Sequence, residues 1–303
     1  MVVSLYDRIP LNNGYTIPRI GLGTAGLSGA EAEEAVFYAL NQGYRLIDTA
    51  ASYDNEEEVG RGINLAINAG ISRDEIFVVT KIAPEDMGFN KTIDAFEASL
   101  ERLNTQYIDL LLIHKPAKDD EVTLDTWRAM EDIYASGRVQ SIGVSNFSRG
   151  HLAMLLDEAK VRPAVNQYQM YPGASDRSTN GYCDDENIVS MAYSPLKKGK
   201  VQKERRLMSI SENYDKSPEQ IALRWSIDRN VVPIPQSGNK DHIRDNINIF
   251  DFSLSDNDMT ILNNLDVPRK DRDTGDGGGN TDRTNRRKNI QKGRGSGTGR
   301  MRH

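Results

Sequence analysis

Short, nearly continuous apolar runs recur along the chain and are separated by longer amphipathic stretches. The eight runs cover residues 19–23, 45–48, 76–80, 108–114, 140–145, 164–167, 188–194 and 231–235. A short run that is apolar on both faces is typical of a strand buried on both sides of a parallel sheet. We therefore predict eight such strands. A β-hairpin over residues 9–17, with Asn13-Gly14 at its turn, is expected to precede them.

The stretches between the runs carry signals for helix starts. Residues 28–31 and 72–75 have the capping-box pattern, and residues 217–220 add proline at the first helical position. Segment 173–185 is poor in helix formers, so we expect a loop with at most a short helix there. Alternation of strands and helices fits a closed (β/α)8 barrel or a doubly wound open sheet, and the strand count favours the barrel.

Two motifs suggest other dehydrogenase folds, but neither decides the matter. The glycines of 21–26 form a G-x-G-x-x-G, and Asp48 lies 22 residues beyond the last of them. This nearly matches the dinucleotide fingerprint, yet glycines also serve tight turns and close backbone approach. Tyr193 and Lys197 have the spacing of a helical Tyr-x-x-x-Lys motif. Pro195 lies between them and excludes a helix interior.

Four polar residues follow three successive predicted strands: Asp48, Tyr53, Lys81 and His114. In a barrel, the carboxyl ends of the strands face one common mouth. The group suits carbonyl reduction, in which Tyr53 donates a proton to the developing alkoxide. A neighbouring Lys81 lowers the pKa of that phenol, Asp48 keeps the lysine charged, and His114 orients the carbonyl oxygen. No metal-ligand spacing accompanies them, and no metal is expected.

From residue 9 to residue 264 the chain resembles the aldo-keto reductases. The resemblance is carried by GLGT (21–24), DTAASYDNEEEVG (48–60), TK (80–81), LLIHKP (111–116), IGVSNF (142–147), NQYQMYP (166–172), AYSPL (192–196) and IPQS…N (234–246). It implies an α/β (β/α)8 TIM barrel with a short N-terminal β-hairpin. It also implies NAD(P)H-dependent reduction of a small aldehyde, ketone or keto-sugar to the alcohol, with Tyr53 as general acid.

The resemblance also implies a set of cofactor-binding residues. Those expected to hold the nicotinamide carboxamide are Ser145, Asn146 and Gln167. Tyr193 would stack on the nicotinamide ring. The remaining cofactor contacts are expected from Gly23, Thr24, Ser194, Leu196, Gln236, Ser237, His242 and Asn246.

The chain departs from the family pattern where the 2′-phosphate of NADPH would bind. Gln236 and His242 stand where the family usually has lysine and arginine. Two lost charged contacts weaken the preference for NADPH, since each contributes roughly 1.5–3 kcal/mol. NADPH is the family's cofactor, and we expect NADH to compete with it here unless Lys240 or Arg244 takes over the lost contacts.

Two further departures concern the substrate mouth. Ala25 and Lys115 stand where the family often has tryptophan, so we expect a wider and more polar mouth. An inward-pointing Lys115 favours anionic or polyhydroxylated carbonyl compounds. An outward-pointing Lys115 is simply solvated, and the sequence leaves both arrangements open.

Composition sets limits on the class of protein. The chain has 303 residues, of which 38% are apolar and 27% charged, and its single cysteine, Cys183, excludes an intrachain disulfide. It contains neither a run of 18 apolar residues nor a signal-peptide pattern. We expect a cytoplasmic monomer that acts on a small-molecule carbonyl substrate and does not contact a membrane.

The last 35 residues differ from the rest. Residues 269–303 carry 11 basic and 4 acidic side chains and eight glycines, whereas residues 1–268 carry 27 basic and 40 acidic ones. We expect residues 1–268 to form the barrel and 269–303 to be a disordered, basic tail. Nucleic-acid binding by the tail is a weaker alternative, because no aromatic residue interleaves its arginines. A non-catalytic, cofactor-sensing subunit is the other alternative.

Overall fold

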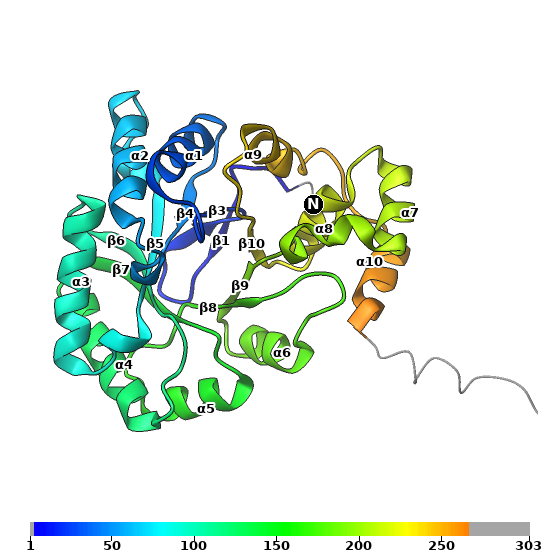
Figure 1. The fold of residues 1–303 in the computed structure, drawn as a ribbon. Coiled ribbons are helices and arrows are strands. Elements are labelled where there is room, and N and C mark those ends of the chain that lie inside the picture. The colour runs from blue at the N-terminus through cyan, green and yellow to red at the C-terminus, as the bar shows by residue number, and fades with distance from the viewer. Residues whose placement is uncertain (1–2, 267–303) are drawn as a thin grey trace, which may run out of the picture. The chain divides into compact units, whose positions relative to one another are not determined.

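The computed structural model describes residues 3–266, which contain a closed barrel of eight parallel strands (Figure 1). Each strand pairs in parallel with its neighbours in the chain. The strands are β3 (Leu22–Gly23), β4 (Leu46–Asp48), β5 (Phe77–Ile82), β6 (Ile108–Ile113), β7 (Val139–Ser145), β8 (Val165–Gln169), β9 (Val189–Tyr193) and β10 (Val232–Ile234). All eight predicted strands are confirmed.

The barrel closes between its first and last strands. The N–H of Gly21 donates to Pro233 O at 3.1 Å, and that of Gly23 donates to Pro235 O at 3.0 Å. A Cβ atom on Gly21 would lie 2.1 Å from Leu46 Cδ2, so a side chain at position 21 would displace the buried Leu46 side chain at this join. The glycine motif therefore serves close packing at the seam, and the closure excludes the doubly wound open sheet.

The predicted hairpin is also confirmed. Strands β1 (Arg8–Pro10) and β2 (Thr16–Pro18) pair antiparallel, with Ile9 opposite Ile17. Both isoleucines are buried in the cluster that fills the barrel interior, together with Phe77 at the start of β5. The hairpin covers the amino ends of the strands. The carboxyl ends, where barrel enzymes carry their chemistry, remain open.

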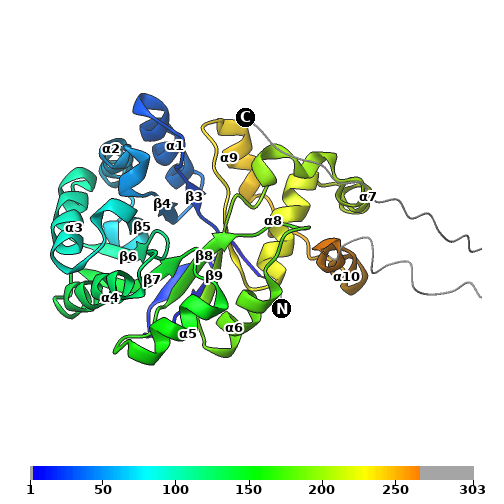
Figure 2. The ribbon, with the colours of Figure 1, turned by 60° about the horizontal axis from the view of Figure 1, so that its bottom comes forward.

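Helices surround the strands in both views, and α7 and α10 lie outside α8 (Figures 1 and 2). The α-helices are α1 (Gly29–Asn41), α2 (Glu56–Asn68), α3 (Phe89–Leu103), α4 (Asp120–Ala135), α5 (Arg149–Glu158), α6 (Arg177–Asp185), α7 (Arg205–Tyr214), α8 (Pro218–Asp228), α9 (Lys240–Ile247) and α10 (Asp256–Asn263). Single 3-10 turns are η1 (Ala51–Tyr53), η2 (Arg73–Glu75), η3 (Pro84–Asp86), η4 (Lys197–Gly199), η5 (Val201–Lys203) and η6 (Asn264–Asp266).

The predicted capping boxes have three different outcomes. The box at 217–220 forms and begins α8. The box at 72–75 also forms, but it begins only the single turn η2. The box expected at Ser28 is wrong, because its side chain makes no capping hydrogen bond. The Glu31 carboxylate instead lies against Gly238, where an added Cβ atom would be only 2.1 Å from Glu31 Oε1.

Segment 173–185 forms a loop followed by a short helix, as expected. Its last nine residues form α6, and Asp176 caps the helix by accepting the N–H of Thr179 at 3.0 Å. Within residues 3–266, no helix is long and apolar enough to cross a membrane. The expectation of a disordered 269–303 tail lies outside the described residues.

Candidate active site

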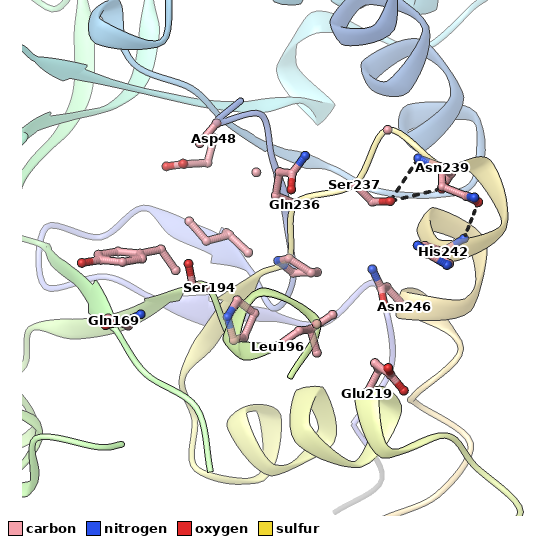
Figure 3. A pocket seen from close by; sticks show the side chains of 18 of the residues that line it. Asp48, Gln169, Ser194, Leu196, Glu219, Gln236, Ser237, Asn239, His242 and Asn246 are labelled. Atoms are coloured by element: carbon pink, nitrogen blue, oxygen red, sulfur yellow. Dashed lines mark hydrogen bonds between the residues drawn. The ribbon is translucent and has the colours of Figure 1, made fainter. Parts of the chain in front are cut away.

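An elongated pocket of about 1110 Å³ opens at the carboxyl ends of the strands. Asp48 and Gln169 lie at its inner end, and Glu219, His242 and Asn246 lie at its outer end (Figure 3). The pocket brings together most of the side chains selected from the sequence. Those that line it are Gly23, Ala25, Asp48, Tyr53, His114, Ser145, Asn146, Gln167, Tyr193, Ser194, Leu196, Gln236, Ser237, His242 and Asn246.

Three of the selected residues do not line the pocket. Lys81 is buried beneath the inner end, in contact with Asp48. Thr24 is also buried, and both its N–H and its hydroxyl donate to Asp48 O. Lys115 is exposed outside the pocket.

The inner end is organised around the buried ammonium group of Lys81. Its Nζ donates to both carboxylate oxygens of Asp48 at 2.8 and 3.0 Å and to Thr49 O at 2.8 Å. It also donates to Tyr53 Oη at 3.3 Å. An ammonium group has three protons, so these partners use its full donor capacity. Because Tyr53 Oη accepts this bond, its own proton remains available to a group in the pocket.

Burial and charge act in opposite directions on these groups. Burial raises the pKa of Tyr53 above its usual value, and the charge of Lys81 offsets only part of that rise. Lys81 thus acts on the pKa of this phenol in the expected direction, and the larger effect of burial was not foreseen. Burial lowers the pKa of Lys81, but attraction to Asp48 and Tyr53 outweighs it and leaves that pKa raised. The lysine is therefore charged at neutral pH.

His114 is a neutral imidazole in this environment. Burial, with the charges of Lys81 and Lys115, lowers its pKa to about 4. Its Nδ1 lies 3.1 Å from the hydroxyl oxygen of Ser52, and its ring meets the Tyr53 ring edge-on with centroids 5.7 Å apart. When Ser52 donates to Nδ1, the remaining ring proton is on Nε2. A neutral histidine can then donate a hydrogen bond to a carbonyl oxygen.

Amide side chains form the adjoining wall. Asn146 has a left-handed backbone (φ 61°), and its Nδ2 donates to His114 O at 2.9 Å. Its Oδ1 accepts the hydroxyl of Tyr193 at 2.9 Å, which holds that ring in place. Gln167 Nε2 donates to Asp48 Oδ1 at 2.7 Å. This bond joins β8 to the Lys81 cluster, and no pattern along the chain predicts it.

The outer end is built on the loop before α9. Ser237 Oγ accepts the N–H of Asn239 at 3.1 Å, and Asn239 Oδ1 accepts the N–H of His242 at 3.2 Å (Figure 3). These bonds fix the first turn of the helix. Gln236 and His242 both line the pocket here, as predicted for the residues that replace the family's cations.

The charges of the outer end are mainly negative. Glu31, Glu219 and Asp245 line it, and neither Lys240 nor Arg244 does. Lys240 Nζ lies 3.5 Å from Glu34, and Arg244 pairs with Asp241 at 2.9 Å and with Asp245 at 3.1 Å. Both cations that could replace the family's lysine and arginine are thus engaged with carboxylates.

The sequence matches the aldo/keto reductase family over residues 19–267. The chain belongs to this family. It is 44% identical over 266 residues to the glyoxal reductase of Bacillus subtilis (strain 168). The aligned region covers 88% of this chain and 95% of that protein. The chain is therefore an oxidoreductase that acts on carbonyl groups.

Solved structures of the family share the fold. An aldo/keto reductase from Brucella melitensis superimposes with a TM-score of 0.83 at 41% identity, covering 86% of this chain and 99% of that chain. An aldo-keto reductase from Bombyx mori, solved in complex with NADP, superimposes with a TM-score of 0.81 at 35% identity. That match covers 89% of this chain and 98% of that chain. The expected TIM barrel is confirmed.

Some pocket residues were missed by the sequence analysis. Gln169 follows Gln167 by two positions in β8, and that spacing along a strand puts both on one face, so a signal was present. Glu31 and Glu219 belong to helices that reach the pocket only through folding. No spacing in the sequence connects them to Gln236.

Proposed function

We propose that this reductase converts small, polar aldehydes, ketones or keto-sugars to alcohols with a reduced nicotinamide dinucleotide, and that Tyr53 supplies the proton. The observation that carries the proposal is the hydrogen-bonded group of Asp48, Lys81 and Tyr53 beneath an open pocket. Lys81, the cation of this group, donates a hydrogen bond to the phenol of Tyr53, which lines the pocket.

The pocket suits a dinucleotide in size and in donor set. Its volume of about 1110 Å³ lies just above the range that is usual for small-ligand sites, about 300–1,000 Å³. Ser145, Asn146 and Gln167 would hold the nicotinamide amide, and Tyr193 would stack on the ring. The middle and outer parts of the dinucleotide would contact Gly23, Ser194, Leu196, Gln236, Ser237, His242 and Asn246. Thr24 is buried outside the pocket, so it would act through its hydrogen bonds to Asp48 O and not by direct contact.

Each residue of the inner end would have its own part in protonating the carbonyl oxygen. A bound reduced nicotinamide supplies the hydride to the carbonyl carbon. Tyr53 donates its proton to the carbonyl oxygen as negative charge develops there, and Lys81 stabilises the resulting phenolate. Asp48 keeps the ammonium group charged and fixed. Neutral His114 donates a hydrogen bond to the same oxygen and orients the substrate.

Both NADPH and NADH are proposed as cofactors, with NADH competitive. Gln236 is neutral, and the carboxylates of Glu31 and Glu219 oppose the charge of a 2′-phosphate, whereas Asp245 is paired with Arg244. These features support a weaker preference for NADPH than a pair of cations at positions 236 and 242 would give.

The substrate class is proposed from the mouth of the pocket. Ala25 gives a wide entrance, which suits a small dicarbonyl compound. Lys115 is exposed outside the pocket, so it would act on a keto acid only weakly, through its charge at the rim. The name of the Bacillus subtilis relative, a glyoxal reductase, agrees with this class.

The decisive experiment follows the loss of reduced-nicotinamide absorbance. NADPH and NADH are offered in parallel with glyoxal, methylglyoxal, nitrobenzaldehyde and keto-sugars, to wild type and to Tyr53→Phe. We expect turnover with both cofactors in the wild type and a loss of about 10²–10⁴-fold in kcat in the variant. Cofactor affinity, measured by fluorescence titration, should be unchanged.

Other outcomes have clear meanings. Binding of both cofactors without oxidation of either would replace the proposal with a cofactor-sensing subunit. Equal turnover in Tyr53→Phe would remove Tyr53 as the acid. A preference for NADPH of several hundredfold would remove the cofactor part of the proposal alone.

A further inference from the structure

A buried asparagine lies two residues after Tyr53, in the loop that carries this tyrosine. The side chain of Asn55 is fully buried and does not line the pocket. Its Nδ2 donates to Thr24 O at 2.9 Å and to Leu27 O at 2.8 Å, and its Oδ1 accepts the hydroxyl of Thr49 at 2.9 Å. Both amide protons and one lone pair of Oδ1 are therefore used within the protein.

The partners of Asn55 belong to the backbone that holds the inner end. Thr49 O accepts a hydrogen bond from Lys81 Nζ at 2.8 Å, and the Thr24 N–H donates to Asp48 O at 3.0 Å. Asn55 thus joins the loop after β3, the end of β4 and the loop of Tyr53. Each of these segments contacts either Lys81 or Asp48 or carries the phenol itself.

The next residue anchors the same loop on its other side. Glu56 is buried, and its Oε1 accepts the hydroxyl of Thr80 at 2.5 Å, directly before Lys81 in β5. Its Oε2 accepts the hydroxyl of Ser99 at 3.2 Å and Nε of Arg102 at 2.7 Å. The loop is consequently held to β5 and α3 even when the bonds of Asn55 are lost.

We propose that Asn55 is a positioning residue that sets the separation between Tyr53 Oη and Lys81 Nζ. That contact, at 3.3 Å, is the longest of the hydrogen bonds of Lys81, so a small displacement of the loop breaks it first. Only Asp54, in a left-handed conformation (φ 52°), separates the two side chains along the chain. The inference rests on the proposed role of Tyr53 as the proton donor.

The first test compares Asn55→Ala with a matched control, Asn180→Ala. Asn180 is also buried and hydrogen-bonded at both ends of its amide, to Asp184 and Arg229, but it lies on α6 outside the pocket. We expect kcat to fall about 10- to 100-fold in Asn55→Ala, with the Kd for the dinucleotide changed less than threefold. In Asn180→Ala, kcat should remain within twofold of wild type even if Tm falls, because Asn180 lies outside the pocket that holds the proton donor.

A milder variant keeps the inference testable if Asn55→Ala does not fold. Thr49→Val is nearly isosteric and removes only the hydroxyl that bonds to Asn55 Oδ1. We expect kcat to fall about three- to tenfold with KM nearly constant. The basic limb of the pH profile of kcat should move to higher pH, because a phenol displaced from Lys81 loses a stabilising charge.

A readout without turnover completes the test. In protein labelled with ¹³C-tyrosine, the Tyr53 resonance is assigned by its absence in Tyr53→Phe and titrated against pH. We expect Tyr53 to ionise at higher pH in Asn55→Ala and Thr49→Val than in wild type, and unchanged in Asn180→Ala.

Two results would overturn the inference. One is a loss of kcat in Asn55→Ala no larger than that in Asn180→Ala. The other is an unchanged Tyr53 titration in Thr49→Val together with unchanged kcat. A wild type that binds the dinucleotide but turns over no carbonyl would instead be a failure of the proposed function, and the NMR titration would still decide the positioning role.

Discussion

The two ends of the pocket neutralise their charges in different ways. At the inner end, Lys81 and Asp48 are buried together, and every donor of the ammonium group has a partner within the protein. At the outer end, carboxylates line an open surface, while Lys240 and Arg244 lie outside it and pair with Glu34, Asp241 and Asp245. The inner end is therefore fixed by the packing of the barrel. Charges at the outer end can be exchanged with little effect on the fold.

The largest effect is expected where the buried pair is broken. Lys81→Met leaves the carboxylate of Asp48 buried without its cation, and we expect a loss of about 3–5 kcal/mol in the free energy of unfolding. Catalysis should fall by at least the factor expected for Tyr53→Phe, because the phenol loses its stabilising charge. Urea denaturation and steady-state kinetics measure the two losses.

A double variant separates stability from catalysis at this pair. Asp48→Asn removes the unpaired charge in the Lys81→Met background and retains an oxygen that can accept the bond from Gln167. Most of the lost stability should return, but turnover should not. Recovery of turnover in this double variant would contradict the role of Lys81.

Substitutions at the outer end should change the preference between NADPH and NADH and leave the stability of the fold nearly unchanged. Gln236→Lys together with His242→Arg supplies two cations for a 2′-phosphate, and we expect the ratio of kcat/KM for NADPH over NADH to rise about 10- to 100-fold. The Tm should change little. Gln106→Lys, which adds a charge away from this pocket, is the control and should leave the ratio unchanged.

A smaller effect is expected in the pH dependence of stability. The pKa of His114 is about 4 in the folded protein, below its value of about 6.5 when unfolded, so the unfolded chain binds the proton first. The contribution of His114 to the free energy of unfolding is therefore fully present above pH 6.5 and is lost as the pH falls toward 4. Allowing for its partial exposure, the loss is roughly 2 kcal/mol.

Urea denaturation at pH 7 and pH 4.5 measures this loss. His114→Gln should reduce the difference between the two pH values, whereas His151→Gln, outside the pocket, should not. The same difference in both variants would show that other groups dominate the pH dependence.

The smallest effect is expected at the exposed rim. Lys115→Met removes a charge near the mouth, and we expect KM for a keto acid to rise about two- to fivefold with no change for a neutral aldehyde. Lys118→Met, an exposed change on the same loop, is the matched control. An equal change for both substrates would rule out recognition of the substrate charge.

Sequence reasoning was most successful for features whose place in the fold follows from a local pattern of residues. The eight strands were predictable because each is apolar on both faces, and Asp48 and Lys81 were predictable because they lie near strand ends. The pKa of Tyr53 was not, because it depends on how far burial outweighs the charge of Lys81. That balance is a property of the packed barrel.

Connections between distant segments were also hidden from the sequence. Asn55 and Glu56 occur in a motif that marks the family, yet nothing in it states that Asn55 bonds to Thr24 or Glu56 to Thr80. The failed capping box at Ser28 has the same origin, because Glu31 lies against Gly238, a residue more than 200 positions away. Such contacts appear only when the chain closes on itself.

The seam between β3 and β10 has a consequence for synthesis of the protein on the ribosome. Gly21 and Gly23 form hydrogen bonds to Pro233 and Pro235, so a segment made at the start of translation waits for one made near its end. Until then the edges of β3 and β10 cannot pair, and exposed strand edges favour association between chains. The glycines that allow the tight join thus take part in a pairing of high sequence separation, which can form only after most of the barrel has been synthesised.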